Sequence, residues 1–334
     1  MRAFFRRGFS RVASAMARDY RNSPAWEDAM LLAGVQASLQ VRQVRSVQVL
    51  GDVEFRVFSQ WGEDGIIEWL VSRLPGIPTS VVEFGVEDFF EANTRFLVQN
   101  RNWRALVMDG SRRNMDRLRN HRMYWRHDIT AVTAFIDRDN INTLIGDNGF
   151  DGEIGILSID LDGNDYWVWK AIEVVRPWIV VGEFNGVLGD MLPVTIPYDP
   201  EFSRMDAHYS GQYFGTSVAA LCRLAAEKGY TLLGTPRTGI NAFFVRNDVA
   251  GAFDGAILDR RPFPSTVRDA RGTNGALTYT AGADRLLLVA HLSVVNVATG
   301  KIISLADAGP LYSSWWSSPG KVRILDNGMG SVSL

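Results

Sequence analysis

Cysteine is nearly absent from this sequence of 334 residues. Cys222 is the only one, so an intramolecular disulfide and a cysteine-ligated zinc site are both excluded. A single thiol fits a reducing compartment, and we expect a cytoplasmic protein. Its neighbours with the spacing of one helix face are Val218, Leu221 and Ala225. This pattern predicts a thiol that is packed in the core.

Long apolar runs are also missing. No uncharged stretch approaches the ~18 residues of a membrane span. The first 18 residues are instead basic, with five arginines and no acid before Asp19, and their apolar residues recur at near-helical spacing. They predict a helical arm that is solvated or packs on a partner subunit of a homo-oligomer. The alternative is a peripheral contact with the inner surface of a membrane.

Neither sign of charge is in excess. The sequence has 35 lysines and arginines against 37 acids, so we expect no nucleic-acid partner. The length suits one large α/β domain with extensions, or two domains. Any charged partner must therefore be recognised by local charge.

The middle of the chain has the alternating strand and helix patterns of an α/β domain. Short, nearly all apolar runs predict buried parallel strands at 80–84, 104–109, 154–160 and 178–184, with a weaker candidate at 123–129. A helix at 217–229 precedes two strands, 230–235 and 241–247, that should form an antiparallel hairpin. We therefore divide the chain into three parts. These are a helical N-terminal arm (1–50), a Rossmann-like domain (51–254) and a C-terminal extension with a hairpin and an aromatic tail (255–334).

Acidic side chains follow these strands, at the edge where an open parallel sheet binds its ligands. They include Glu83 to Asp88, Asp109, Asp128, Asp160 to Asp165, and Glu183 with Asn185. Phosphate-rich nucleotides would be repelled here, and no GxxxxGK[ST] loop is present to offset the repulsion. S-adenosylmethionine fits better, because it is cationic and has no phosphate.

Each of these positions has an expected role toward that cofactor. Gly85 lets the backbone approach it, Glu83 faces the methionine ammonium, and Asp109 accepts from the ribose hydroxyls. Asp128 is the adenine contact. Glu87 disfavours phosphates, and either touches the ligand or only shapes the turn. Ser59 and Gln60 lie in a polar turn that closes over the cofactor, unless Asp64 merely caps the following helix.

A set of oxygen ligands predicts a site for Mg²⁺ or another divalent cation. Its members are Asp160, Asp162, Glu183 and Asn185. Asn164 and Asp165 belong to the set or serve as turn and cap residues. Such an ion would lower the pKa of an acceptor hydroxyl and orient it, with Asp160 as a catalytic residue. His208, in the long segment 185–216, is the predicted general base or acceptor-positioning residue, unless it is a solvent-facing loop histidine.

Six motifs together resemble class I S-adenosylmethionine-dependent methyltransferases, and the bacterial FkbM-related group in particular. They are SQWGEDGII (59–67), EFGVEDFFEANTR (83–95), LVMDGS (106–111), ILSIDLDGND (156–165), TIPYDP (195–200) and NAFFVR (241–246). The resemblance implies a seven-stranded sheet with a reversed last strand and O-methylation of a small-molecule or glycan acceptor, often a sugar. The class as a whole has a GxGxG loop, whereas this chain keeps only Gly85.

Other functions remain compatible with the same residues. A silent cofactor-binding or glycan-binding module would keep the fold and lose the acids of the metal set. The stretch SIDLDGN (158–164) is similar to the nucleophile loop of metal-dependent phosphotransferases, but no later lysine and acidic pair accompanies it. The same acids could hold the metal of a glycosyltransferase, whose nucleotide-diphosphate donor would then meet an acid-rich edge.

Overall fold

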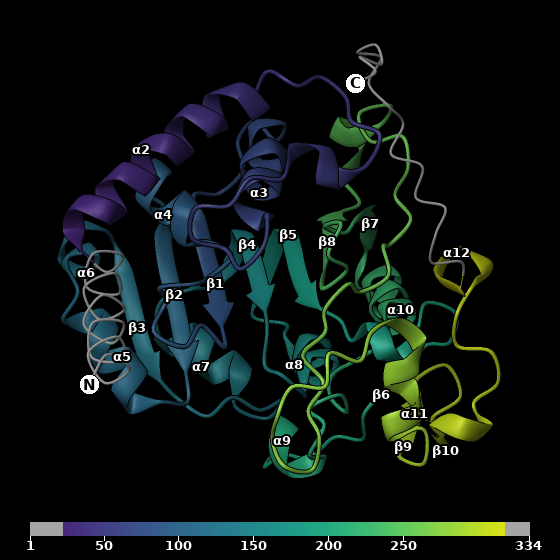
Figure 1. Cartoon of the computed structure of the whole chain (residues 1–334). Coiled ribbons are helices and arrows are strands. Elements are labelled where there is room, and N and C mark those ends of the chain that lie inside the picture. The colour runs from purple at the N-terminus through teal and green to yellow at the C-terminus, as the bar shows by residue number, and fades with distance from the viewer. Residues whose placement is uncertain (1–22, 318–334) are drawn as a thin grey trace, which may run out of the picture.

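The computed structural model of the chain describes residues 23–317, and its centre is a seven-stranded sheet (Figure 1). The strand order is β3-β2-β1-β4-β5-β8-β7, and β8 is antiparallel to both of its neighbours while the other pairs are parallel. This confirms the predicted Rossmann-like sheet with an antiparallel last strand. The strands are β1 Ser80–Phe84, β2 Arg104–Asp109, β3 Ile129–Thr133, β4 Gly152–Ile159, β5 Val175–Glu183, β7 Tyr230–Gly234 and β8 Asn241–Arg246.

Four predicted strands and the hairpin of β7 and β8 are confirmed within a few residues, but the prediction for the third strand is wrong. Residues Arg122–Arg126 form the short helix α6, and β3 begins only at Ile129. The aromatic residues at 124 and 125 led to the prediction of a strand because aromatic residues are common in strands. The true strand, ITAVT, is an edge strand with a half-exposed face, so its apolar pattern is weak.

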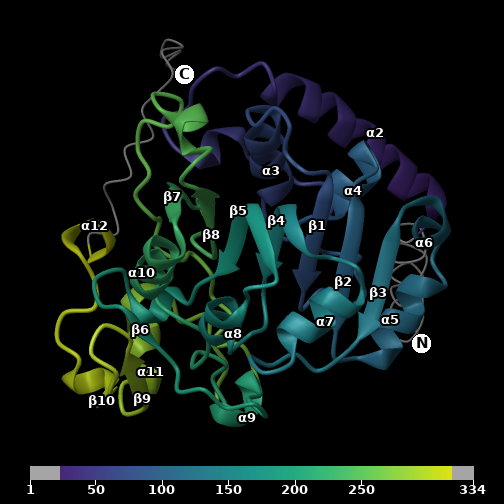
Figure 2. The same ribbon diagram turned by 180° about the vertical axis from the view of Figure 1, so that it is seen from behind.

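Helices cover both faces of the sheet because each central strand is apolar on both sides. Val81 joins the core under one group of helices, and Val82, next in sequence, joins the core under the other. The first group is α3 Glu63–Ser72, α4 Arg95–Arg101, α5 Arg112–Arg119 and α6, with α2 Pro24–Val41 packed outside α3 and α4 (Figure 1). The second group is α7 Ile141–Asp147, α8 Asp165–Ala171 and α10 Val218–Lys228 (Figure 2).

The C-terminal segment folds back against the long connection between β5 and α10. Strands β9 Ser293–Asn296 and β10 Lys301–Ser304 form the second predicted hairpin, and β9 also pairs with β6 Val194–Thr195 of that connection. The short helices are α9 Arg204–Ala207, α11 Leu286–Val289, α12 Ser314–Ser317, η1 Leu50–Val53, η2 Gly186–Leu188, η3 Ala250–Phe253, η4 Gly282–Arg285 and η5 Leu305–Asp307. In Figure 1 the lime-green segment between η3 and η4 runs beside α9, below the carboxyl ends of the strands.

Two sequence predictions concern the ends of the chain and its relation to a membrane. The basic amphipathic helix predicted for residues 1–18 lies outside the described residues. Over positions 23–317, no helix combines the length and the apolarity that a membrane crossing requires.

Gly85 is the position where the fold tolerates a side chain least. Its φ is +74°, and a Cβ atom there would lie 1.4 Å from the carbonyl oxygen of Asp160. Gly76 has a similar φ of +83° but nothing within 4 Å of a Cβ. Both glycines therefore have a left-handed backbone, but only at Gly85 would an added Cβ atom clash with a neighbouring atom.

We predict that Gly85→Ala destabilises the protein by more than about 4 kcal/mol, or prevents folding. Gly76→Ala should lose only the ~1–2 kcal/mol of a left-handed alanine. Urea unfolding of the two variants measures the difference, which isolates the contact between the ends of β1 and β4. Equal losses would show that this contact is not tight.

Candidate functional site

The loop after β1 keeps a left-handed backbone at three alternate positions although only the first is glycine. The φ angles are +74° at Gly85, +48° at Glu87 and +62° at Phe89. A non-glycine residue pays roughly 1–2 kcal/mol for this conformation. Phe89 is fully buried in the core, and the amide of Glu87 donates to Asp109 Oδ2 at 3.0 Å. These two anchors hold the backbone in the shape that further glycines would adopt more readily.

Asp109 ends β2 and connects two backbone segments. Besides the amide of Glu87, its carboxylate accepts from the amide of Ser111 at 2.7 Å through Oδ1. Each carboxylate oxygen has a further lone pair, and Asp109 lines a cavity. The predicted ribose contact is compatible with this placement and stays a prediction.

The carboxylate of Glu83 accepts hydrogen bonds from several protein groups. It is 3% exposed and accepts from the amides of Asn93 and Thr94 at 2.9 and 3.0 Å. The hydroxyls of Thr94 and Ser158 donate to it as well. Burial raises its pKa, while these donors favour the charged form. The carboxylate fastens the start of α4 to the sheet, and its predicted contact with a methionine ammonium is not tested by this geometry.

Two cavities open at the carboxyl edge of the sheet and share Gly85, Glu87, Asp160 and Asp162 in their walls. The smaller, about 200 Å³, lies over the ends of β1 to β4. Its other lining residues are Asp109, Gly110, Ala134, Phe135, Ile136, Leu161, Asn164 and Phe202. The larger, about 800 Å³, extends toward β5 and β8 and is closed by segment 265–285 from the C-terminal part of the chain.

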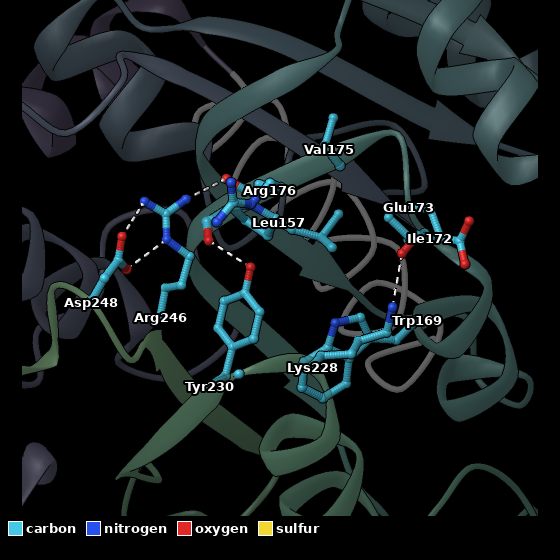
Figure 3. A pocket seen from close by; sticks show the side chains of 12 residues that line it. Leu157, Trp169, Ile172, Glu173, Val175, Arg176, Lys228, Tyr230, Arg246 and Asp248 are labelled. Carbon is cyan, nitrogen blue, oxygen red and sulfur yellow. Dashed lines mark hydrogen bonds and ion pairs between the residues drawn. The ribbon is translucent and has the colours of Figure 1, made fainter.

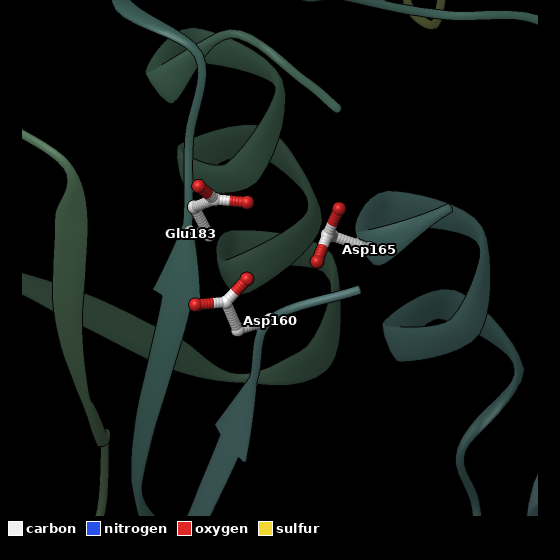
Figure 4. Close-up of side chains that lie close together, drawn as sticks. All are labelled: Asp160, Asp165 and Glu183. Atoms are coloured by element: carbon white, nitrogen blue, oxygen red, sulfur yellow. The ribbon is translucent and has the colours of Figure 1, made fainter. Parts of the chain in front are cut away.

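Three carboxylates converge at the carboxyl edge of the sheet (Figure 4), and one of them, Asp160, lines both cavities. Asp160 follows β4, Glu183 ends β5 and Asp165 begins α8. One ligand oxygen of each lies within 4.8 Å of the others. Burial, followed by mutual repulsion, raises the pKa of Asp160 and of Glu183 well above the ordinary range. Such crowding is costly unless a proton or a cation is shared.

Asp165 differs from its two neighbours because its oxygens already have donors. They accept from the amides of Leu161 at 2.7 Å and Gly163 at 3.1 Å, and burial raises its pKa to about 6. In Glu183, by contrast, Oε2 is buried and has no hydrogen-bond partner. An unpartnered buried carboxylate oxygen beside two more carboxylates fits a bound divalent cation.

The structure places the other two predicted ligands differently. The side chain of Asn185 makes three hydrogen bonds to the protein, since Oδ1 accepts from Val187 N and Nδ2 donates to the carbonyls of Gln212 and Phe214. Asp162 lines both cavities, is 60% exposed and pairs with Arg204 at 2.7 Å. Asn185 therefore anchors a loop, and its role as a ligand stays a prediction, while the third carboxylate of the cluster is Asp165. The sequence included Asp165 in the oxygen set but could not separate it from a helix cap.

His208 is not among the residues that line either cavity, so this geometry does not support its predicted role as a general base, which stays a prediction. Its Nδ1 is hydrogen-bonded to Ser210 Oγ at 2.7 Å, and its ring packs against Tyr209 and His291. Burial lowers its pKa. The residue of α9 that enters the cavity is Arg204, four positions earlier. The path of an irregular loop depends on distant contacts, and no local spacing specified it.

Asp128 is also misplaced by the sequence prediction. It precedes β3 and lies at the opposite edge of the sheet, where its carbonyl accepts from the amide of Ala105 at the start of β2. Its carboxylate is exposed, 3.9 Å from Arg104. Asp128 therefore cannot contact an adenine at the carboxyl edge. The residues that do follow β3 and line the smaller cavity are Ala134, Phe135 and Ile136.

In the turn before α3, one predicted residue stabilises the turn and the other lines a cavity. Ser59 is buried and exchanges hydrogen bonds with Asp64, whose Oδ2 also accepts from the amides of Val57 and Phe58. Gln60 and Trp61 line the larger cavity. Ser59 therefore shapes the turn, while the prediction for Gln60 as a cofactor contact remains open.

A further cavity, about 440 Å³, lies at the opposite edge of the sheet (Figure 3). Several of its polar side chains are bound to other protein groups. Arg246 pairs with Asp248 at 2.7 Å, Lys228 donates to the carbonyl of Ile172 at 2.8 Å, and Tyr230 donates to that of Pro177 at 2.7 Å.

Comparison with known proteins finds similarity between this chain and several solved structures. No family model and no curated relative matches the chain. An O-methyltransferase from Bacillus cereus in complex with SAH is 16% identical, covers 69% of this chain and 95% of its own, and has a TM-score of 0.35.

Two further similar structures are S-adenosylmethionine-dependent methyltransferases. The one from Mesorhizobium loti is 16% identical with 55% of this chain and 100% of its own covered, and the TM-score is 0.35. The one from Clostridium acetobutylicum is 11% identical with 55% and 90% covered, and the TM-score is 0.35. These scores are low, so the fold assignment depends on the strand order and directions described above.

The strained loop generates a prediction. Glu87→Gly should raise the free energy of unfolding by about 0.5–1 kcal/mol, because relief of the left-handed strain exceeds the added flexibility of the unfolded chain. Glu91→Gly is the matched control, since Glu91 is an exposed acid of the same loop without a positive φ. It should not stabilise the protein. If both substitutions act alike in urea unfolding, the strain at Glu87 is absent.

Proposed function

We propose that this protein is an S-adenosylmethionine-dependent O-methyltransferase that acts on a hydroxyl group of a sugar or glycan with the help of a divalent cation. The observation that carries the proposal is the charge of the smaller cavity. Its described lining residues include Glu87, Asp109, Asp160 and Asp162 and no lysine or arginine. A cationic adenosyl cofactor is favoured there, and the diphosphate of a nucleotide sugar or nucleoside triphosphate is disfavoured.

The residues of the smaller cavity have distinct tasks in this proposal. Asp109 accepts hydrogen bonds from the ribose hydroxyls while it holds the loop at Glu87. Phe135 offers an exposed aromatic face to the adenine. Glu87 contributes negative charge beside the sulfonium and ammonium. These acids bind and orient the cofactor rather than accelerate the reaction, because the sulfonium charge disperses in the transition state.

The larger cavity suits a polyhydroxylated acceptor. Its volume, about 800 Å³, lies within the usual range for ligand sites. Amide side chains in its wall include Asn93, Gln212 and Asn241, and the buried Oδ1 of Asn241 has no hydrogen-bond partner. The exposed ring of Trp61 adds aromatic surface against which a sugar ring packs. This combination of amides and an aromatic ring favours a sugar over an apolar acceptor.

The acid cluster is placed between the two ligands. S-adenosylmethionine supplies an electrophilic methyl group, and a divalent cation lowers the pKa of a hydroxyl group. Asp160 and Glu183 would hold such a cation, with Asp165 beside them. Through that cation Asp160 would orient the acceptor hydroxyl, whose proton passes to solvent as the methyl group is transferred.

Isothermal titration tests the cofactor. S-adenosylmethionine and S-adenosylhomocysteine should bind, and a UDP-sugar should not, each measured with and without Mg²⁺. Asp109→Ala should weaken binding of S-adenosylhomocysteine by about 1–3 kcal/mol through lost charged hydrogen bonds. Asp128→Ala, at the opposite edge of the sheet, should leave it unchanged. Absence of heat with both adenosyl ligands under every metal condition would rule out the proposal.

Glu183→Gln tests the cation. Without divalent ions at neutral pH the variant should be at least as stable as the unsubstituted protein, because one of the crowded carboxylates is removed. Mg²⁺ should raise the melting temperature of the unsubstituted protein by ligand binding to the native state and have little effect on the variant. Glu173→Gln, a surface control with the same chemical change, should respond to Mg²⁺ as the unsubstituted protein does. An equal response in all three proteins would place the ion elsewhere.

A further inference from the structure

The larger cavity has walls of opposite charge. Acids from the strand ends, among them Asp160 and Glu183, form its floor. Another part of the wall comes from the segment between η3 and α11 and includes Arg268, Arg271 and Arg285. A ligand that fills the cavity therefore meets guanidinium groups from this segment as well as carboxylates from the strand ends.

Arg285 is the buried member of this wall. It is 4% exposed, and it ends η4. Its recorded hydrogen bonds are long, at 3.4 Å from Nε to the carbonyl of Gly282 and 3.4 Å from a terminal nitrogen to the carbonyl of Ser265. No carboxylate between residues 23 and 317 forms an ion pair with it.

The other buried arginines of the described chain are neutralised. Arg95, 2% exposed, pairs with Glu27, and Arg246, 8% exposed, pairs with Asp248 and Glu153. Burial lowers the pKa of Arg285. Electrostatic interaction with Asp269 and Tyr312, neither of which forms an ion pair with Arg285, acts in the opposite direction. A buried guanidinium without a counter-ion is unfavourable, so Arg285 is the buried arginine that lacks compensation.

Asp269, the nearest acid on the same wall, is already engaged. Its Oδ2 pairs with Arg204 at 2.8 Å and its Oδ1 accepts from Gln212 at 2.9 Å. Arg204 also pairs with Asp162 and lies over the ring of Phe214. These contacts fix Arg204 and Asp269 to each other and leave the Arg285 guanidinium for a ligand.

The position of Arg285 assigns it to the acceptor rather than to the cofactor. η4 packs against η2, which follows β5, and Gly186 of η2 is in close contact with Ser265. No residue of segment 265–285 lines the smaller cavity over β1 to β4. In the proposed reaction the cofactor therefore contacts a cavity wall without arginines, whereas the acceptor contacts a wall that includes arginines.

We propose that the acceptor carries a carboxylate group that Arg285 binds, which makes a uronic acid or uronide its substrate class. This inference rests on the proposed function. A guanidinium matches a carboxylate through two parallel hydrogen bonds. The cavity as a whole has more acids than arginines in its wall, so a singly charged carboxylate fits better than a phosphate dianion. Gln212 and Asn241 line the same cavity and offer amide groups to the ring hydroxyls.

Ligand-observed NMR and calorimetry on protein saturated with S-adenosylhomocysteine test the inference. The probes are the methyl glycosides of glucuronate and galacturonate, those of glucose and galactose, and glucose 6-phosphate. At least one uronide should bind about tenfold or more tightly than its neutral counterpart. Arg285→Gln should abolish that preference and leave the affinity for S-adenosylhomocysteine within about twofold.

Controls separate recognition from folding. Arg223→Gln, an exposed arginine on α10, should behave like the unsubstituted protein. If Arg285→Gln does not fold, Arg285→Lys keeps the charge but removes the two-pronged geometry, and should still weaken uronide binding. Equal binding of uronides and neutral glycosides, or tighter binding of glucose 6-phosphate, would overturn the inference.

Two outcomes distinguish this inference from the proposed function. Loss of S-adenosylhomocysteine affinity in Arg285→Gln, with unchanged uronide binding, would assign the guanidinium to the cofactor carboxylate and refute the inference. Arg285-dependent uronide binding by a protein that does not bind S-adenosylhomocysteine would support the carboxylate site while the methyltransferase proposal fails.

Discussion

The approach of Gly85 to the carbonyl of Asp160 is the contact on which the site depends. It joins the loop after β1 to the end of β4 at a distance that no side chain could share. Because of it, Glu87 and the acids after β4 line the same two cavities. The amide of Glu87 then reaches Asp109, which ties the end of β2 to the same loop. One close backbone contact and one hydrogen bond thus assemble residues from three strands.

This assembly brings many carboxylates together, and the protein compensates most of them. Glu83 has hydroxyl and amide donors, Asp165 has the amides of its own turn, and Asp162 has Arg204. The Oε2 atom of Glu183 is the part without a hydrogen-bond partner, and the pKa of the neighbouring Asp160 is raised well above its ordinary value by burial and by repulsion from Asp162 and Asp165. Buried groups left without partners are unfavourable for folding, and they concentrate where a ligand supplies the missing partner. Arg285 is the cationic counterpart in the wall of the larger cavity.

Much of the sheet could be predicted because buried parallel strands are short, continuous apolar runs. The strands at 80–84 and 104–109 coincide with β1 and β2, and the hairpin after α10 was readable from its turn residues. β3 was missed because an edge strand has a half-exposed face and a weaker pattern. That single error moved Asp128 to the wrong edge of the sheet, since a strand's ends decide which residues reach the site.

The sequence by itself determined the fold class and the acidic character of the carboxyl edge, because strands, their ends and the residues that follow them are local features. Only the tertiary structure decided which of these acids meet, that Asn185 and His208 serve the loops, and that Phe89 holds a left-handed turn without glycine. It also brought Arg285 from more than a hundred residues beyond Asp160 to the wall of the same cavity. Such contacts depend on how long connections pack, and no spacing along the chain encodes them.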